Sequence, residues 1–244
     1  MIFLKKIKKF STSVRNIRPV SHVIFDIDGL LLRTEDIYYK TDEQVIAKYG
    51  KKYTWDLRMK ILGCSEQTTA ETLVSELKLP ITPTKYNEEV KKILKKTLKE
   101  ASLMPGAERL VKHLAANNIP IAVATSSGKE SVIAKTSKHQ QLFKLFHHIV
   151  MASSDSEIKH GKPAPDVFLV CAKRFPDNPN PEKCLVFEDS PNGVKAAINA
   201  NMQVVLVPEE YVSDEDRKLA TCVINSLNDF NPELFGLPPF RDCD

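Results

Sequence analysis

Two aspartates stand at the end of a strongly apolar segment, "HVIFDIDGLLL". Asp26 and Asp28 are two positions apart, so on an extended strand both side chains point the same way, and Gly29 then lets the chain turn sharply. Two carboxylates this close repel each other, which favours a bound cation or one protonated partner. An EF-hand calcium loop is excluded because Leu30 and Ile37 fill positions that need oxygen ligands. A surface turn with two solvated acids is the alternative.

Two further segment ends carry side chains that suit phosphate. The segment "IAVATSS" closes on Thr125, Ser126 and Ser127, whose hydroxyl and backbone N–H groups suit phosphate oxygens. Hydroxyl residues also cap helices, so this triplet has a purely structural alternative. The segment "HGKPAPD" places Lys162 in a turn between glycine and proline. A lone lysine is more often a solvated surface charge, and only the combination of segments favours a functional role.

A second pair of acids ends another apolar segment. "CLVFEDS" finishes in Glu188 and Asp189, whose alternative role is to cap the helix predicted by "PNGVKAAINA". Together with Asp26 and Asp28, these acids make up a carboxylate set of the kind that holds Mg²⁺ beside phosphate and water. We therefore predict a magnesium site with these four residues as ligands.

The combined set points to phosphoryl transfer. Asp26 would attack phosphorus and form an aspartyl-phosphate, which is a form of covalent catalysis. Asp28 would protonate the departing alcohol and then take a proton from the water that hydrolyses the intermediate. Thr125, Ser126 and Lys162 would bind the phosphoryl oxygens and stabilise their charge. The sequence thus predicts a Mg²⁺-dependent phosphomonoester hydrolase that acts on a small phosphorylated metabolite.

The elements that must position these residues alternate along the chain. Apolar runs within "HVIFDID", "IPIAVATSS", "HHIVMASS", "CLVFEDS" and "MQVVLVP" predict strands, and "CVINSL" is a candidate sixth. Their nearly continuous Val, Ile, Leu and Phe content favours strands covered on both faces. Helical patterns such as "GAERLVKHLAANN" and "PDVFLVCAKRF" lie between them. We expect a doubly wound, Rossmann-like α/β fold whose ligands bind at the carboxyl ends of parallel strands.

Residues 35–103 interrupt this alternation. Three segments there, "DIYYKTDEQVIAKYG", "SEQTTAETLVSELK" and "YNEEVKKILKKTLKEA", have helical spacing, and no strand-like run separates them. We predict a small, all-helical cap domain inserted after the first strand of a core domain formed by residues 21–34 and 104–244. Because the insert leaves and rejoins the core near the end of the first strand, we expect it to lie over the site as a lid.

Composition narrows the class of protein. No apolar run approaches the roughly 18 residues that a membrane span needs. The five cysteines are scattered without C-x-x-C spacing, which favours reduced thiols in an intracellular compartment over disulfides or zinc. The net charge of +4 arises from residues 1–20, which hold six basic residues and no acid, so the remainder sums to −2. We expect a monomer with neither a nucleic-acid nor a membrane partner.

The basic segment itself, "MIFLKKIKKFSTSVRNIRPV", mixes basic, apolar and hydroxyl residues without any acid. This composition is typical of mitochondrial transit peptides. The alternative is a basic tail on a cytosolic protein. We expect a cytoplasmic location, with mitochondrial import through this leader as the alternative.

The segments "DIDG", "ATSS", "GKPAPD" and "FEDS", in this order and with a helical insert after the first, resemble the haloacid dehalogenase superfamily of phosphohydrolases over residues 20–238. The resemblance implies Asp26 as the nucleophile and Asp28 as the acid/base. It also implies that Thr125 and Lys162 bind phosphate. The acids of "FEDS" would serve the Mg²⁺ site together with Asp26 and the backbone carbonyl of Asp28.

Other segments are similar to the pseudouridine-5′-phosphatases of animals. They include "LMPGAERL", "CLVFEDSPNGVKAA" and the tail "NSLNDFNPELFGLP", which lies outside any catalytic motif. The resemblance implies a nucleoside monophosphate as substrate, with pseudouridine 5′-phosphate as the best single candidate. Two alternatives stay open: a phosphatase of sugar or polyol phosphates with the same machinery, and a catalytically idle binding protein.

The chain departs from the family pattern at two places. Arg33 stands where the family usually has aspartate, so we expect Thr34 to cap the helix that follows. Ser65 and Glu66 occupy positions where relatives tend to carry basic residues. An acid that faces a phosphorylated substrate would repel it, so these two residues bear on substrate identity.

Overall fold

The computed structural model describes residues 17–61, 64–210 and 212–241. In this part of the chain, six parallel strands form one sheet in the order β3-β2-β1-β4-β5-β6. The strands are β1 (His22–Phe25), β2 (Ile121–Thr125), β3 (Ile149–Met151), β4 (Cys184–Glu188), β5 (Gln203–Leu206) and β6 (Cys222–Val223). The predicted α/β fold is confirmed, and the candidate sixth strand is present.

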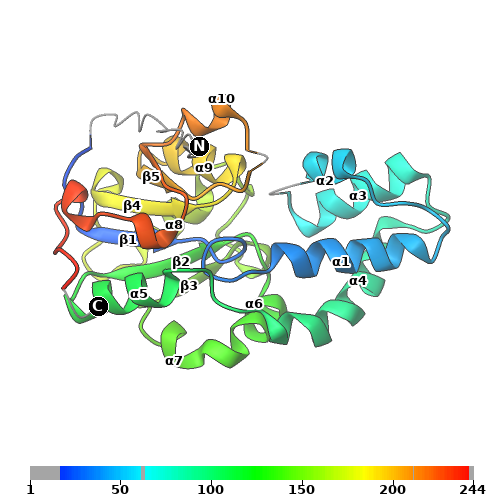
Figure 1. Ribbon diagram of the computed structural model, residues 1–244, viewed down its shortest axis with the longest axis horizontal. Helices are drawn as coiled ribbons and strands as arrows, with labels where there is room; N and C mark the ends of the chain where they lie inside the picture. Colours follow the sequence, from blue (N-terminus) through cyan, green and yellow to red (C-terminus); the bar gives the residue numbers. More distant parts are fainter. Residues whose placement is uncertain (1–16, 62–63, 211, 242–244) are drawn as a thin grey trace, which may run out of the picture.

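Helices cover both faces of the sheet, and a separate group of helices lies beside it (Figure 1). The helices are α1 (Glu35–Ala47), α2 (Trp55–Ile61), α3 (Glu66–Leu77), α4 (Pro83–Thr97), α5 (Ala107–Ala116), α6 (Lys129–Thr136), α7 (Gln140–Phe143), α8 (Asp166–Lys173), α9 (Pro191–Asn199) and α10 (Asp214–Arg217). Short 3₁₀ turns occupy Leu98–Glu100, Ser137–His139, Ala152–Ser154, Pro181–Lys183, Leu227–Asp229 and Pro232–Phe235. Among the described residues, no helix is both long and apolar enough to cross a membrane.

Strand β1 is central and pairs with β2 on one side and β4 on the other. The chain adds β2 and β3 on one side of β1 and then returns to place β4, β5 and β6 on the other side. The connections therefore diverge at the carboxyl ends of β1 and β4. In parallel α/β sheets this divergence leaves a crevice that binds ligands. The sheet order thus locates the expected site beside the residues that follow β1.

The residues of β1 alternate between two hydrophobic clusters. Val23 and Phe25 belong to a cluster with α5, α7 and the C-terminal segment, whereas Ile24 faces a cluster with α8 and α9. Phe25 stacks on Phe187 of β4 with ring centroids 4.9 Å apart. Burial of each such side chain stabilises the fold by about 1.5–3 kcal/mol. Both faces are covered, which explains why β1 reads as a continuous apolar run.

The helices α1–α4 share a hydrophobic cluster of their own. Val45 and Ile46 of α1 pack in it with Leu73 of α3 and Tyr86 of α4. Figure 1 shows this group beside the core, connected to it through the chain that follows β1. Helix α2 was not expected from the sequence, because its seven residues carry only a short apolar pattern. We propose that α1–α4 form the cap domain with the boundaries given above.

The last residues of the basic leader form hydrogen bonds with the core. Residues 1–16, which carry most of this basic segment, lie outside the described residues. The backbone N–H of Arg18 donates to Gln203 Oε1 at 2.9 Å, and Gln203 Nε2 donates back to the Arg18 carbonyl at 2.8 Å. The Val20 N–H donates to the Phe235 carbonyl at 2.9 Å. The end of the leader therefore contributes to the fold of the core.

Candidate active site

Lys162 lies among three acceptors at the carboxyl end of the sheet. Its Nζ donates to Asp26 Oδ1 at 2.6 Å, to Glu188 Oε1 at 2.6 Å and to the Ala124 carbonyl at 3.2 Å. The same ammonium lies 4.9 Å from the centroid of the Phe168 ring. Burial opposes its charge, but Asp26 and Glu188 outweigh that effect and hold the pKa of Lys162 above its usual range. The lysine is therefore a fixed positive charge against the expected nucleophile.

The charge of Lys162 does not fully offset the effect of burial on the carboxyl of Asp26. Burial raises the pKa of Asp26 to about 7; Lys162 opposes the rise, and Glu188 and Asp28 add to it. A carboxyl that is half protonated near neutral pH is a weak nucleophile. Additional positive charge next to Asp26 would hold it ionised, because an opposite charge favours the charged form.

Asp28 has the opposite environment. Thr34 Oγ1 donates to its Oδ1 at 2.7 Å, Ser127 Oγ donates to its Oδ2 at 3.0 Å, and Lys135 forms an ion pair with Oδ2. Burial alone would raise the pKa of Asp28, but Lys135 and these hydrogen bonds hold it below its usual range. Two acids only two positions apart are thus tuned in opposite directions, as pairs with different catalytic roles often are.

Lys135 and Thr34 were not expected to contact Asp28. Lys135 is fully buried on α6, and the only available signal was its spacing of three residues from the buried Val132. Thr34 does stand at the N-cap position of α1, yet its side chain makes no capping hydrogen bond. The expectation that Thr34 caps this helix is wrong. Its backbone is αR instead of extended, and its hydroxyl donates to the charged Asp28.

The hydroxyl residues after β2 border the same site. Thr125 ends the strand fully buried, and its Oγ1 accepts the Ser127 N–H at 3.1 Å. The carbonyl of Ser126 accepts a hydrogen bond from Ser153 Oγ at 2.6 Å, which holds the turn in place. Thr125, Ser126 and Ser127 line one cavity together with Asp26. Ser127 was noted in the sequence but not predicted as a site residue. Its hydrogen bond to Asp28 shows that it belongs to the site.

The two acids that follow β4 have different surroundings. Glu188 uses Oε1 for Lys162, while its Oε2 accepts the N–H groups of Asp189 (3.1 Å) and Ser190 (3.3 Å) and the Ser190 hydroxyl (3.2 Å). Gly193 is required beside it, because a Cβ there would lie 1.9 Å from the Glu188 carboxylate. Glu188 therefore holds Lys162 and the start of α9 in their relative positions. Its predicted role as a metal ligand stays a prediction.

Asp189 lies against Gly29, where an added Cβ would stand 2.1 Å from Asp189 Oδ2. Burial, followed by the charges of Glu188 and Asp26, raises the pKa of Asp189 well above its usual value. Burial and the charge of Asp28 likewise raise the pKa of Glu35 to about 7. A cluster of buried and half-buried acids that raise one another's pKa values is stabilised by a cation.

The donor set fits a hard divalent cation. Mg²⁺ is usually bound by one or two carboxylates, with water and substrate phosphate completing its coordination. Asp26 and Asp189 have carboxyl groups available for this role and line the same cavity. Within the described ranges, no three His, Cys, Asp or Glu side chains form a ready-made metal cluster. The site therefore fits an ion that shares its coordination with the substrate.

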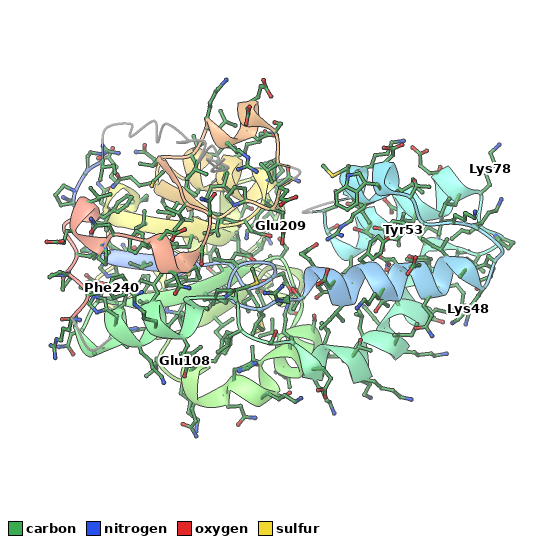
Figure 2. All side chains as sticks on the ribbon, viewed as in Figure 1. Lys48, Tyr53, Lys78, Glu108, Glu209 and Phe240 are labelled. Atoms are coloured by element: carbon green, nitrogen blue, oxygen red, sulfur yellow. The ribbon has the colours of Figure 1, made fainter. Side chains whose placement is uncertain are left out.

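The cavity extends from these residues into the helical group. Its volume is about 180 Å³, and its lining includes Asp26, Thr125 and Lys162 from the core. From α1–α4 and the loop before α2, its lining includes Glu35, Tyr38, Tyr39, Asp42, Tyr53, Arg58, Thr69, Tyr86, Asn87, Val90 and Leu94. Figure 2 shows Tyr53 within the helical group and Glu209 on the side of the core that faces it. A molecule with its phosphate at Asp26 would extend toward the aromatic side chains of α1–α4.

Ser65 and Glu66, at the start of α3, also border the cavity. Ser65 accepts the Thr68 N–H at 3.2 Å as the N-cap of α3. Glu66 forms an ion pair with Lys91 at 3.4 Å, and both side chains are exposed. The charge of Lys91 therefore offsets part of the negative charge of Glu66 beside the cavity. Exposed ion pairs of this kind contribute little to stability.

Comparisons with known proteins agree with this geometry. Residues 23–207 match the model of the haloacid dehalogenase-like hydrolase family. The chain is 48% identical over 226 residues to a Drosophila melanogaster protein named probable pseudouridine-5′-phosphatase, covering 93% of this chain and 98% of that protein. It is 44% identical to (DL)-glycerol-3-phosphatase 2 of Arabidopsis thaliana, covering 92% and 95% respectively.

Solved structures show the same fold. A β-phosphoglucomutase from Clostridium difficile superposes with a TM-score of 0.74 at 26% identity, covering 89% of this chain and 96% of that one. The predicted likeness to the pseudouridine-5′-phosphatases is also confirmed. With its family match, its relatives and its fold in agreement, the chain belongs to the haloacid dehalogenase-like hydrolases.

Proposed function

We propose that this protein, an enzyme of the phosphoric monoester hydrolase class, removes the phosphate of pseudouridine 5′-phosphate through an aspartyl-phosphate on Asp26. The contact between Lys162 Nζ and Asp26 Oδ1 carries the proposal. It places a buried cation against one carboxylate at the end of a cavity, while the neighbouring Asp28 is tied to a different lysine. The two aspartates, although only two positions apart, thus have the different surroundings that a nucleophile and an acid/base need.

In the first step, a carboxylate oxygen of Asp26 forms a bond to phosphorus as the bond to the leaving alcohol breaks. Lys162 offsets the negative charge of the approaching phosphate, and Thr125 and Ser126 bind its oxygens at the end of β2. Asp28 gives a proton to the departing alcohol. The nearby phosphate charge raises the proton affinity of the Asp28 carboxylate, which allows it to hold that proton.

In the second step, water replaces the carboxylate of Asp26 on phosphorus. Asp28, now ionised, takes a proton from that water as it attacks. Thr34, Ser127 and Lys135 keep the Asp28 carboxylate oriented through both steps. Inorganic phosphate leaves, and Asp26 is free again.

The proposed cofactor is Mg²⁺, held by the carboxylates of Asp26 and Asp189 and the backbone carbonyl of Asp28. When bound, it supplies positive charge for the phosphoryl oxygens and for the buried acids. Gly29 lacks a side chain that would occupy the space of Asp189, so the acid reaches this position.

Phosphate release from a panel of metabolites tests the proposal. We expect release from pseudouridine 5′-phosphate, loss of release in EDTA and its recovery with added Mg²⁺. Asp26→Asn is expected to reduce kcat by at least about a thousandfold, because the amide is a poor nucleophile. Normal turnover by this variant would exclude the covalent mechanism, and release without any divalent ion would exclude the cofactor.

A phosphatase of polyol or sugar phosphates is the second candidate. It is favoured by the 44% and 42% identity to two Arabidopsis thaliana proteins named (DL)-glycerol-3-phosphatases. The same machinery would serve either substrate, because the reacting group is identical. A higher kcat/KM for glycerol 3-phosphate than for pseudouridine 5′-phosphate would favour this candidate.

We further propose a monomer in the cytoplasm without a nucleic-acid or membrane partner. Mitochondrial import remains the alternative, and the relative named (DL)-glycerol-3-phosphatase 1, mitochondrial, supports it. Import followed by cleavage after Val20 would remove the backbone contacts of Arg18 and Val20 with the core. The mass of the protein purified from cells decides between an intact and a shortened N-terminus.

A further inference from the structure

One face of α1 lines the cavity. Glu35, Tyr38, Tyr39 and Asp42 all border it, and their spacings of three and four residues place them on the same side of the helix. Glu35 lies at the catalytic end, since its Cγ would be 3.4 Å from a Cβ on Gly29. Asp42 follows two helical turns later, about 10 Å along the axis. This helix face therefore spans the cavity from the catalytic acids toward its far end.

Asp42 is a buried acid with one hydrogen-bonded oxygen. Its residue is 7% exposed, and Tyr86 on α4 donates its hydroxyl to Asp42 Oδ1 at 2.7 Å. Within the described part of the chain, no group donates to Oδ2, and Oδ2 is not among the enclosed polar atoms that lack a partner. Because Asp42 lines the cavity, Oδ2 is an acceptor open to a molecule inside it.

A purely structural role would not need this second oxygen. A tie between α1 and α4 is complete with the Tyr86 contact alone, and an apolar residue would suit the neighbouring cluster around Val45 and Ile46. Burial of a carboxylate costs several kcal/mol unless its oxygens are paired. A ligand that donates a hydrogen bond to Oδ2 would offset this cost. The position thus has the properties of a recognition group.

The surroundings of Asp42 favour a planar ring. Tyr39 and Tyr53 stack with ring centroids 5.0 Å apart, and Val90 adds an apolar surface to the cavity lining. Aromatic and apolar walls with a few placed polar groups are typical of sites for small molecules with rings. A leaving group must extend about 10 Å from the catalytic acids to reach Asp42. A three-carbon polyol is too short, whereas a ribose with an attached base has the necessary length.

We propose that Asp42 is a specificity-determining residue whose Oδ2 accepts a hydrogen bond from a ring N–H of the nucleoside leaving group, while Tyr86 holds the carboxylate in place. This inference rests on the proposed function and identifies the part of the site that distinguishes a nucleoside phosphate from a short polyol phosphate. The uracil ring of pseudouridine carries two N–H donors, either of which suits a carboxylate acceptor.

The variant must remove the acceptor without leaving a buried hydroxyl unpaired. The double variant Asp42→Leu/Tyr86→Phe replaces both partners of the hydrogen bond by apolar groups, which is a change that proteins tolerate well. Tyr86→Phe alone is the matched control, because it keeps the Asp42 carboxylate and removes only the hydroxyl that donates to it. Each variant is assayed with pseudouridine 5′-phosphate and with glycerol 3-phosphate, so that the short substrate reports on the catalytic machinery.

We expect the double variant to lose about 10–100-fold in kcat/KM for pseudouridine 5′-phosphate, which corresponds to one hydrogen bond to a charged group. Its kcat/KM for glycerol 3-phosphate is expected to stay within about twofold of the wild-type value, since that substrate does not reach Asp42. Tyr86→Phe is expected to show a smaller loss for the long substrate than the double variant, because the acceptor stays but the hydroxyl that holds it is gone. Equal losses for both substrates, or no loss for either, would overturn the inference.

Binding of the free nucleoside separates this inference from the proposed chemistry. Pseudouridine without phosphate occupies only the far part of the cavity, and calorimetry measures its affinity without any turnover. We expect at least about tenfold weaker binding to the double variant than to the wild type, even if phosphate release proves the proposed reaction wrong. Equal affinity, or no binding to the wild type at millimolar nucleoside, would overturn the role of Asp42 and leave the hydrolase proposal standing.

Discussion

Lys162 Nζ lies 2.6 Å from Asp26 Oδ1, and the two side chains are only 4% and 8% exposed. The lysine reaches Glu188 at the same distance, so one buried cation serves two buried anions. In such a place, removal of the cation leaves uncompensated charge, which is more costly than the loss of a surface ion pair.

Lys162→Met is expected to lower the free energy of unfolding by about 3–5 kcal/mol at neutral pH, because it leaves the carboxylates of Asp26 and Glu188 buried without the cation that pairs with both. It is also expected to reduce kcat by at least about a thousandfold. Urea unfolding and phosphate release measure the two effects. Lys159→Met, at an exposed lysine in the same loop, is the control. Unchanged stability of the Lys162 variant would contradict the charge balance described here.

Gly193→Ala is expected to destabilise the protein by about 1–3 kcal/mol, because the new Cβ would stand 1.9 Å from the Glu188 carboxylate. Displacement of Glu188 also disturbs Lys162, so kcat is expected to fall. Gly161→Ala provides a matched control, since nothing lies within 4 Å of a Cβ at that position. Thermal unfolding of the two variants side by side measures the difference, and equal stabilities would refute the steric argument.

Asp42 makes a separate prediction about pH. Burial raises the pKa of Asp42 to about 6, while the hydrogen bond from Tyr86 opposes the rise. The unfolded chain has the ordinary value near 3.9. The folded state therefore binds the proton more tightly, so the contribution of this group to stability is fully present below about pH 4. It is lost as the pH rises through about 6.

Asp42→Asn removes this titration. We expect the free energy of unfolding of the variant, relative to the wild type, to rise by up to about 3 kcal/mol between pH 4 and pH 8. Chemical unfolding at several pH values measures this difference. Glu43→Gln, at an exposed neighbour on α1, is expected to show a nearly constant difference over the same range. A constant difference for the Asp42 variant would show that its carboxyl titrates normally.

Lys135→Met is expected to raise the pKa of Asp28, because the ion pair that holds it ionised is lost. The basic limb of the kcat/KM profile, where Asp28 loses the proton that it gives to the departing alcohol, is then expected to move to higher pH. A purely structural loss would instead lower kcat/KM evenly at all pH values. Lys138→Met is the control, since its exposed side chain pairs only with Glu100 among the described residues. If the apparent pKa of that limb does not change, the role assigned to Lys135 is wrong.

The strands and the paired acids at their ends could be predicted from local sequence. Segments such as the one that contains Val23 and Phe25 are continuous apolar runs, because both faces of the sheet are covered. Acids at the end of such a run stand out, since few functions other than catalysis or metal binding justify carboxylates there. Helix α2 was missed because seven residues give too little periodic signal.

The side chains that contact those acids could not be predicted from the sequence. Lys135 belongs to a helix with charged residues on several sides, and only the neighbouring core shows that this lysine is inside. Thr34 has the residue type and position of a helix cap, yet the nearby charge of Asp28 takes its hydroxyl instead. In each case the outcome depends on a residue that is brought near by tertiary contacts.

By itself, the sequence determined the parallel α/β architecture, the helical insertion and the presence of paired acids at strand ends. These features follow from short-range patterns of apolar and polar residues, which have a direct physical meaning for burial. Only the tertiary structure decided that Lys162 serves Asp26, that Lys135 serves Asp28 and that Asp42 faces the cavity. The strength and sense of an electrostatic interaction depend on distance and burial, and both arise when distant segments of the chain come together.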